Sequence, residues 1–241
     1  ACPICQEEHV ELEETPKTKT SAGGLAANFN TEVQKAMLKV KSLAPPATML
    51  GVVECKCGKK YADQSGTTTR ELCTAATGEG MKHPPAVTKS YEEGGPSEED
   101  YEDTLEITKL GIMGHIGSGG VVGRIFEMAE VRARKSLEGG RTSYPPGNCA
   151  AQKTLLLLLE DHALVAAMTE QWYSAEGKKG RWKGKRKPTK GKIEHIDLRK
   201  GPDVIPAEFN HGDSVPPCGS CELIVPLLLC TQGETKCQHK S

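Results

Sequence analysis

The sequence predicts an α/β fold in which a central sheet carries helices on both faces, preceded by a small cysteine-bearing module. Two observations predict it. In the second half of the chain, segments with helical apolar spacing alternate with short strand-like segments, which is typical of a three-layer α/β domain. In the first 60 residues, four cysteines occur as two close pairs, which is typical of a small module that is stabilised by a metal ion rather than by a large core.

Composition limits the kind of core that the chain can form. Hydrophobic residues make up 37% of the 241 residues and aromatic residues only 4%. We therefore expect a mostly aliphatic core, with part of the chain outside it. The longest apolar runs are residues 155–159 and 223–230, far short of the roughly 18 residues needed to span a bilayer. We predict no transmembrane segment and no membrane partner.

Charge is distributed unevenly along the chain. Residues 1–104 contain 11 basic and 17 acidic side chains, a net charge of −6, whereas residues 105–241 contain 20 and 15, a net charge of +5. The acidic excess is concentrated in residues 92–104, which include Gly and Pro and offer little to bury. We read 92–104 as a solvated linker between an N-terminal module, residues 1–91, and a second domain, residues 105–241.

Patterning in the N-terminal part is weak. Residues 16–28 are rich in Thr, Lys and Gly and are read as a loop. Apolar residues at helical spacing predict a helix from about 30 to 43. A short strand is predicted at 48–53, leading into a turn at 54–58, and residues 62–90 are polar without a clear pattern.

The second domain shows clearer elements. Glycines at 117–120 are read as the entry to a helix that ends near residue 138. Another helix is predicted to begin after Asn148, its expected N-cap, and its five consecutive leucines indicate burial on most sides. The remaining predicted elements are strands at 104–110, 164–173 and 193–198, and a helix at 217–229.

The N-terminal cysteines are arranged as two knuckles. They are Cys2-Pro-Ile-Cys5 and Cys55-Lys-Cys57, which together predict a closed structural zinc site like that of a zinc ribbon. Independent thiols are the alternative, because 49 residues separate Cys5 from Cys55 and the second pair is unusually short. His9 is a possible replacement for one of the four ligands.

Two further segments each place a cysteine at the start of a proline-initiated helix. One contains Pro145-Pro146-Gly147-Asn148-Cys149, and the other Pro216-Pro217-Cys218-Gly219-Ser220-Cys221. A helix N-terminus favours thiolate over thiol, so two facing helix starts can hold three thiolates on one zinc ion and leave the fourth position to water. The alternatives are a redox dithiol at Cys218 and Cys221 and a buried, inert Cys149.

This combination resembles the zinc-dependent nucleobase deaminase superfamily, and within it the bacterial deaminases of polymorphic toxin systems. The resemblance covers about residues 105–241 and implies a three-layer deaminase-like fold with Cys149, Cys218 and Cys221 as ligands of a catalytic zinc ion. It implies attack of hydroxide on the ring carbon that bears the exocyclic amine, with a glutamate two residues after the first ligand carrying the proton.

The sequence departs from the family pattern at that glutamate. Position 151 is alanine, which has no group to carry a proton, so the resemblance implies a chain that binds zinc and turns over little or no substrate. Either the protein is a naturally inactive homologue, or a glutamate was replaced deliberately; the otherwise intact site favours replacement. Glu160 and Glu222 are poor substitutes by position, since Glu160 lies about three helical turns from Cys149.

A strongly basic segment lies between the two helices. Residues 178–192 contain nine Lys or Arg in fifteen positions, with Trp182 inside the run and Trp172 before it. Basic groups neutralise phosphates and aromatic rings stack on unpaired bases, although a solvated hairpin tip is the simpler alternative. The predicted nucleic-acid-binding residues are Trp172, Lys179, Arg181, Trp182, Lys183, Lys185, Arg186 and Lys187.

We therefore expect a zinc-dependent deaminase acting on cytosine in nucleic acid, with single-stranded DNA favoured over RNA. The toxin resemblance implies a cognate immunity protein as partner, and a secreted or delivered effector that works in the cytoplasm of a recipient cell. The alternative is a non-catalytic, zinc-stabilised module that binds nucleic acid or protein, in which Cys230 or His211 completes a four-coordinate site.

Overall fold

A three-stranded antiparallel sheet forms the centre of the molecule. Strand β1 (Ala47–Cys55) pairs with β2 (Lys60–Gln64) on one side and with β3 (Val165–Ser174) on the other. The predicted α/β class is therefore confirmed at this coarse level. The computed structural model describes residues 12–40, 46–84, 90–117, 119–138, 144–184, 205–215 and 217–230, and only the backbone of 134–138, 180–184 and 205–208.

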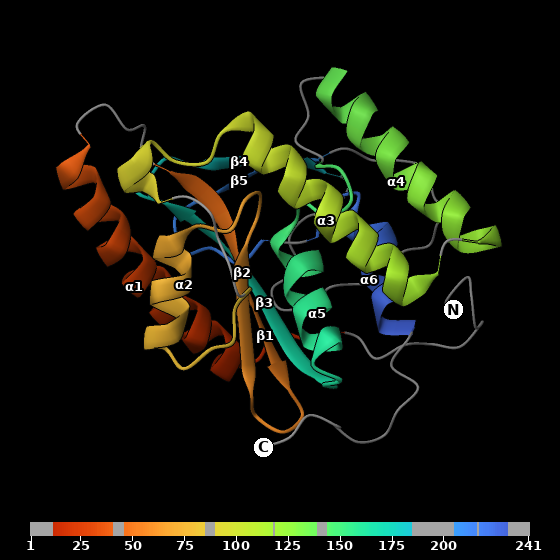
Figure 1. Cartoon of the computed structure of the whole chain (residues 1–241), viewed down its shortest axis with the longest axis horizontal. Coiled ribbons are helices and arrows are strands. Elements are labelled where there is room, and N and C mark those ends of the chain that lie inside the picture. The colour runs from red at the N-terminus through yellow and green to blue at the C-terminus, as the bar shows by residue number, and fades with distance from the viewer. Residues whose placement is uncertain are drawn as a thin grey trace.

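One face of the sheet is covered by α1 (Pro16–Lys39) and α2 (Arg70–Gly78), as Figure 1 shows. Side chains alternate between the two faces of a strand, so Leu50 and Val52 of β1 point to this side, where they belong to one buried cluster with Phe29 of α1. This helical layer lies against β1 and β3 together.

Helix α1 begins much earlier than the sequence predicted. Thr15 is its N-cap in a capping box with Thr18, and Pro16 occupies the first helical position. Residues 16–28, read as a loop, therefore form the first turns of the helix. Their small and apolar members Ala22 and Leu25 are fully buried against the sheet, which outweighs the low helix propensity of the neighbouring glycines.

The other face of the sheet is covered by α5 (Ala150–Glu160), on which α6 (Cys221–Cys230) packs. All residues from Ala150 to Leu159 are buried, which confirms that the leucine run lies in a central helix. This layer shares a second buried cluster with Val53 of β1 and Met168 of β3. Helices therefore lie on both sides of the sheet (Figure 1).

The predicted acidic linker is wrong for most of its length. After the short helix η1 (Tyr91–Glu93), Ser97 forms a capping box with Asp100 and starts α3 (Glu98–Ile116). Acidic residues in the first turn of a helix interact favourably with its dipole, so the acidic run begins a helix here. The strand predicted at 104–110 is also part of α3.

The helix predicted to end near residue 138 is present as α4 (Gly120–Glu138). It follows α3 in the chain and packs on α6. The central sheet draws on both sides of the expected domain boundary, because β1 and β2 precede α3 whereas β3 follows α4. Residues 47–64 are thus built into the same sheet as residues 165–174, and the described part of the N-terminal region does not form a separate module.

Part of the basic segment forms β4 (Gly180–Gly184), which pairs with β5 (Ile205–Phe209) as a two-stranded antiparallel sheet. The strand predicted at 193–198 lies outside the described residues. Among the described helices, none is both long and apolar enough to cross a bilayer.

Gly51, in the middle of β1, allows α5 to lie close to the sheet. A Cβ atom at this position would be 2.6 Å from Thr154 Oγ1 and 3.1 Å from the carbonyl oxygen of Ala150. Both neighbours belong to the first turns of α5, and one of them is backbone. The missing side chain at Gly51 therefore sets how close the start of α5 comes to β1.

We predict that Gly51→Ala destabilises the protein by about 1–3 kcal/mol, because the added methyl group overpacks the contact between β1 and α5. Gly23→Ala is the matched control, since a Cβ at Gly23 in α1 meets nothing within 4 Å. It should stabilise the fold by about 0.5–1 kcal/mol through helix propensity. Urea unfolding measures both. Equal stability of the two variants would contradict this packing.

Candidate metal centre

The structure brings together the three cysteines expected as ligands. The sulfur atoms of Cys149, Cys218 and Cys221, called the cysteine site below, all lie within 4.8 Å of one another. Cys149, rather than the predicted Asn148, is the N-cap residue of α5, with extended backbone angles. Cys221 is the first residue of α6, and Cys218 lies in the turn before it. The two helix starts therefore converge.

The sulfur atoms are close enough together to share a metal ion. Zinc–sulfur bonds of about 2.3 Å in tetrahedral geometry place two sulfurs roughly 3.8 Å apart. The Cys149 and Cys218 sulfurs are 3.0 Å apart, beyond a covalent bond of about 2.05 Å but closer than in a zinc site, so they would have to separate slightly to bind the ion. With this adjustment the cysteine site can hold a thiophilic metal ion such as zinc, with three ligands among the described residues.

The three thiols influence one another's ionisation. Hydrogen bonds from Cys149 and Cys221 hold the pKa of the Cys218 thiol well below its usual value. The pKa of Cys149 is raised well above the usual value, first because of its hydrogen bond with Cys218. Hydrogen bonding among the three sulfurs therefore favours ionisation of Cys218 over that of Cys149 and Cys221. A metal ion would replace their protons, so binding is expected to release protons.

Gln152 links the two helix starts. Its Nε2 donates to Ser220 Oγ at 2.9 Å and to the Cys221 sulfur at 3.4 Å, while its Oε1 accepts from the backbone N–H of Gly147 at 2.6 Å. Gln152 and Ser220 are fully buried. The sequence reasoning missed Gln152, whose only signal is its place in the first turn of a cysteine-capped helix.

Glu170 is a second residue that the sequence reasoning missed. It lies in β3, is only 8% exposed, and its Oε1 accepts a hydrogen bond from the backbone N–H of Ala151 at 2.9 Å. Burial raises the pKa of its carboxyl group to about 8, and the charge of Cys218 acts in the same direction. Asn148 is also buried beside Cys149, and its Oδ1 has no hydrogen-bond partner among the described residues.

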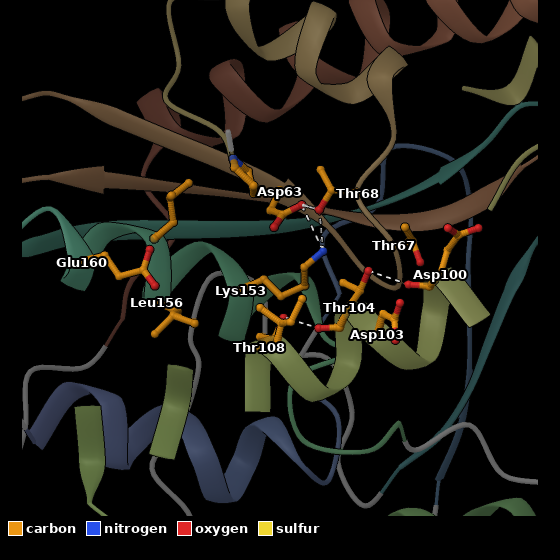
Figure 2. Close-up of a pocket in the computed structure, with 13 residues that line it drawn as sticks. Asp63, Thr67, Thr68, Asp100, Asp103, Thr104, Thr108, Lys153, Leu156 and Glu160 are labelled. Carbon is orange, nitrogen blue, oxygen red and sulfur yellow. Dashed lines mark hydrogen bonds and ion pairs between the residues drawn. The ribbon is translucent and has the colours of Figure 1, made fainter. Parts of the chain in front are cut away.

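A pocket of about 410 Å³ lies farther along α5, between this helix, α3 and the end of β2 (Figure 2). The cysteines do not line it. Its charged lining residues are Asp63, Asp100, Asp103, Lys153 and Glu160. Glu160, considered from the sequence as a stand-in for the missing glutamate, is therefore an exposed residue of this pocket rather than of the cysteine site.

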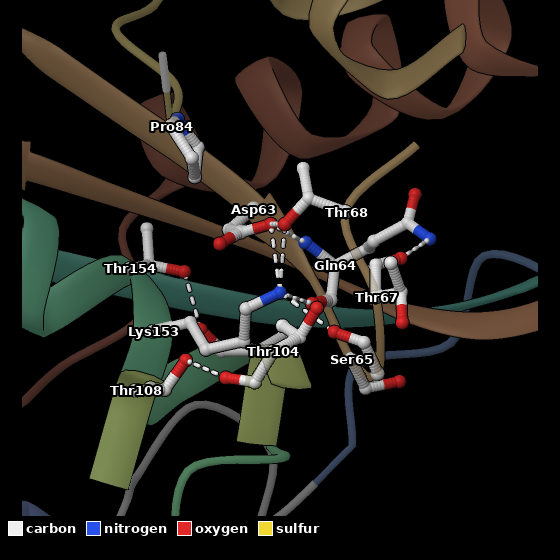
Figure 3. Close-up of polar contacts among 12 residues, drawn as sticks. Asp63, Gln64, Ser65, Thr67, Thr68, Pro84, Thr104, Thr108, Lys153 and Thr154 are labelled. Atoms are coloured by element: carbon white, nitrogen blue, oxygen red, sulfur yellow. Dashed lines mark hydrogen bonds and ion pairs between the residues drawn. The ribbon is translucent and has the colours of Figure 1, made fainter. Parts of the chain in front are cut away.

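Lys153 crosses from α5 to the segment after β2, as Figure 3 shows. Its buried ammonium group donates to Asp63 Oδ1 at 3.2 Å, to Thr68 Oγ1 at 2.8 Å, and to the carbonyl oxygens of Gln64 and Gly66 at 2.9 and 2.7 Å. Burial lowers the pKa of Lys153, and the charge of Asp63 opposes that shift. The network fixes the first turns of α5 one turn after Cys149.

The predicted zinc-ribbon ligands are divided between two parts of the chain. Cys2 and Cys5 lie outside the described residues. Cys55 is buried at the end of β1, and Cys57 is exposed in the turn that leads to β2. The predicted turn at 54–58 is confirmed, with Gly58 at a φ of +91°. It belongs to the hairpin of the central sheet.

The predicted nucleic-acid-binding residues are described in part. Trp172 is half-buried in β3, and its Nε1 donates to the carbonyl oxygen of Lys178 at 3.0 Å. Lys179 is exposed. Arg181, Trp182 and Lys183 belong to β4, and Lys185, Arg186 and Lys187 lie outside the described residues. The start of the basic segment is therefore tied to β3 through Trp172.

His211 and Cys230, the alternative fourth ligands, are not part of the cysteine site. The His211 Nδ1 accepts from the backbone N–H of Ser174 at 3.2 Å, and its ring packs edge-on against Tyr173. Cys230 is the last residue of α6, at the opposite end from Cys221.

Comparisons of the chain with protein-family models, curated proteins and solved structures found no match. The function of the cysteine site is therefore inferred from its own geometry and chemistry, together with the resemblance described above.

We predict that the cysteine site binds one zinc ion per chain. Cys149→Ser should lower the bound zinc by one equivalent, because it removes one of three thiolates. Cys73→Ser, which changes a half-buried thiol of α2, should leave the zinc content unchanged. Atomic absorption after dialysis measures both, and Co²⁺ substitution should give a thiolate-to-metal absorption band that Cys149→Ser weakens. Identical zinc content in the two variants would contradict this site.

We predict that Lys153→Met destabilises the protein by about 3–5 kcal/mol, because it leaves the Asp63 carboxylate buried without its cation. The double variant Lys153→Met/Asp63→Asn should recover part of this loss, since no charge is then left unpaired. Urea unfolding at pH 7 gives the three free energies. A loss below about 1 kcal/mol in the single variant would argue against a buried ion pair.

Proposed function

We propose that this chain is a zinc-dependent deaminase that acts on cytosine in nucleic acid, with single-stranded DNA as the favoured substrate. The observation that carries the proposal is the convergence of three thiols from two helix starts within 4.8 Å. Three protein ligands leave the fourth tetrahedral position to water, which distinguishes a catalytic zinc site from a closed structural one.

In this proposal, the cysteines would bind the zinc ion and Gln152 would position the two helix starts. A bound zinc ion supplies a water molecule with a pKa near neutrality. Cys149, Cys218 and Cys221 would hold the ion, and the partial positive charges of the α5 and α6 N-termini would stabilise their thiolates. Gln152 would keep the two helix starts in register through its contacts with Ser220 and Cys221.

The surroundings support a nucleic-acid substrate. A target base must leave its stack before its exocyclic amine can be reached, and an aromatic ring beside the site can replace the lost stacking. Trp172 lies two residues from Glu170 on β3, so both side chains lie on the face of the sheet that carries the cysteine site. The basic segment begins six residues later, at Lys178. The immunity-protein partner and delivery to a recipient cell remain predictions from the toxin resemblance.

Ala151 leaves the usual proton-carrying position without a carboxylate. It is 1% exposed in the first turn of α5. We predict that zinc-loaded Ala151→Glu converts cytosine to uracil in single-stranded DNA, and that Ala151→Gln, which has the same size but no carboxylate, converts it no faster than the unaltered chain does. Product sequencing and ammonia release measure the conversion, with matching RNA and duplex DNA as further substrates.

The proposal fails if neither the unaltered chain nor Ala151→Glu releases ammonia from any of these polymers while one zinc ion is bound at the cysteine site. Conversion of adenine alone would overturn the choice of cytosine, and conversion confined to RNA would overturn the choice of DNA.

A further inference from the structure

Glu170 lies where a carboxylate can serve the cysteine site. In the register of the sheet it faces Gly51, the residue on which the start of α5 rests. From there its Oε1 reaches the backbone N–H of Ala151, two residues after Cys149. The carboxylate therefore lies at the first turn of α5, beside the position whose side chain lacks a proton carrier.

The burial of Glu170 is costly for a purely structural residue. Only 8% of it is exposed, and within the described residues no lysine or arginine pairs with it. A hydrogen bond to one backbone N–H needs no charge, because an amide or hydroxyl oxygen accepts it equally well. An ionisable group retained in such surroundings is typical of functional sites.

The other two glutamates considered from the sequence lie elsewhere. Glu160 is exposed at the far end of α5, where it lines the separate pocket. Glu222 is paired with Arg132 of α4 at 3.8 Å. Of these three glutamates, Glu170 is the one whose carboxylate lies at the start of α5.

We propose that Glu170 carries the proton in the unaltered chain, in place of the glutamate missing at position 151. This inference rests on the proposed deaminase function and adds the residue that makes the chain itself active. Glu170 would accept one proton from the attacking water and pass it to the ring nitrogen of cytosine. It would then move the second proton of that water from the new hydroxyl group to the amine, which leaves as ammonia while the ring becomes uracil.

The decisive comparison is Glu170→Gln, which keeps an oxygen for the Ala151 N–H and removes only the proton-carrying group. Glu71→Gln is the matched control. Glu71 is also buried and also accepts a backbone N–H, that of Tyr91 at 3.0 Å, but it lies in α2 on the opposite side of the sheet. We expect cytosine conversion by the unaltered chain, a loss of at least about 10²-fold in Glu170→Gln, and less than a twofold change in Glu71→Gln.

A binding measurement provides a second readout. An oligonucleotide with 2-pyrimidinone in place of cytosine accepts water at the same carbon but has no amine to lose. Its hydrated form needs the same proton on the ring nitrogen, so Glu170→Gln should bind it at least tenfold more weakly than the unaltered chain does. Glu71→Gln should bind it normally. Equal binding by all three proteins would overturn the role of Glu170.

The double variant Ala151→Glu/Glu170→Gln separates loss of the proton carrier from loss of the fold, and should regain conversion. An inactive unaltered chain beside an active Ala151→Glu would overturn the role of Glu170 and leave the proposed function standing. Full activity in Glu170→Gln would do the same. Inactivity of both the unaltered chain and Ala151→Glu would instead overturn the proposed function.

Discussion

The contact between Gly51 and the first turns of α5 is the constraint on which the site depends. Because Gly51 has no side chain, Ala150 and Thr154 of α5 can approach β1 closely. Glu170, which pairs with Gly51 across the sheet, therefore reaches the start of α5. The height of α5 above the sheet thus sets the distance between Cys149, at the start of the helix, and the carboxylate of Glu170, on β3. A larger residue in place of Gly51 would increase that distance.

The start of α6 is positioned by the chain segment before it, which pairs with β3 at the edge of the sheet. The backbone N–H of Val215 donates to the carbonyl oxygen of Glu170, and Ser214 forms a bridge with Gln171. The chain then enters the turn that contains Cys218. Cys149 is therefore positioned by the helix that covers the face of the sheet, whereas Cys218 and Cys221 follow a segment that pairs with the edge strand β3. Glu170 and Gln171 of β3 contact both parts of the chain. In this way Cys149 and Cys218, 69 positions apart in the sequence, come into contact.

The sequence predicted features that depend on local rules. Prolines before a cysteine marked the start of α5, and a run of leucines marked a helix buried on most sides. The start of α6 was predicted at residue 217, whereas the helix begins at Cys221. The reading failed where tertiary packing decides. The glycines of α1 suggested a loop, but burial of Ala22 and Leu25 against the sheet stabilises a helix there. The acidic run suggested a linker, but it forms the first turn of α3. Glu170 and Lys153 were missed because a polar residue in an apolar pattern does not show which partner will face it.

The charge balance of the site argues that a cation belongs to it. Three thiols and a buried carboxylate gather at the start of α5, and in the described part of the chain no ammonium or guanidinium group pairs with Glu170. The nearby buried cation, Lys153, is already held by Asp63 and two carbonyl oxygens. Hydrogen bonds from Cys149 and Cys221 lower the pKa of Cys218, while the pKa values of Cys149 and Cys221 are raised, so the site without an ion favours ionisation of Cys218 over that of the other two thiols. A divalent ion at the cysteine site would supply positive charge for the other thiolates, so occupancy of the metal site and stability of the fold around it should be linked.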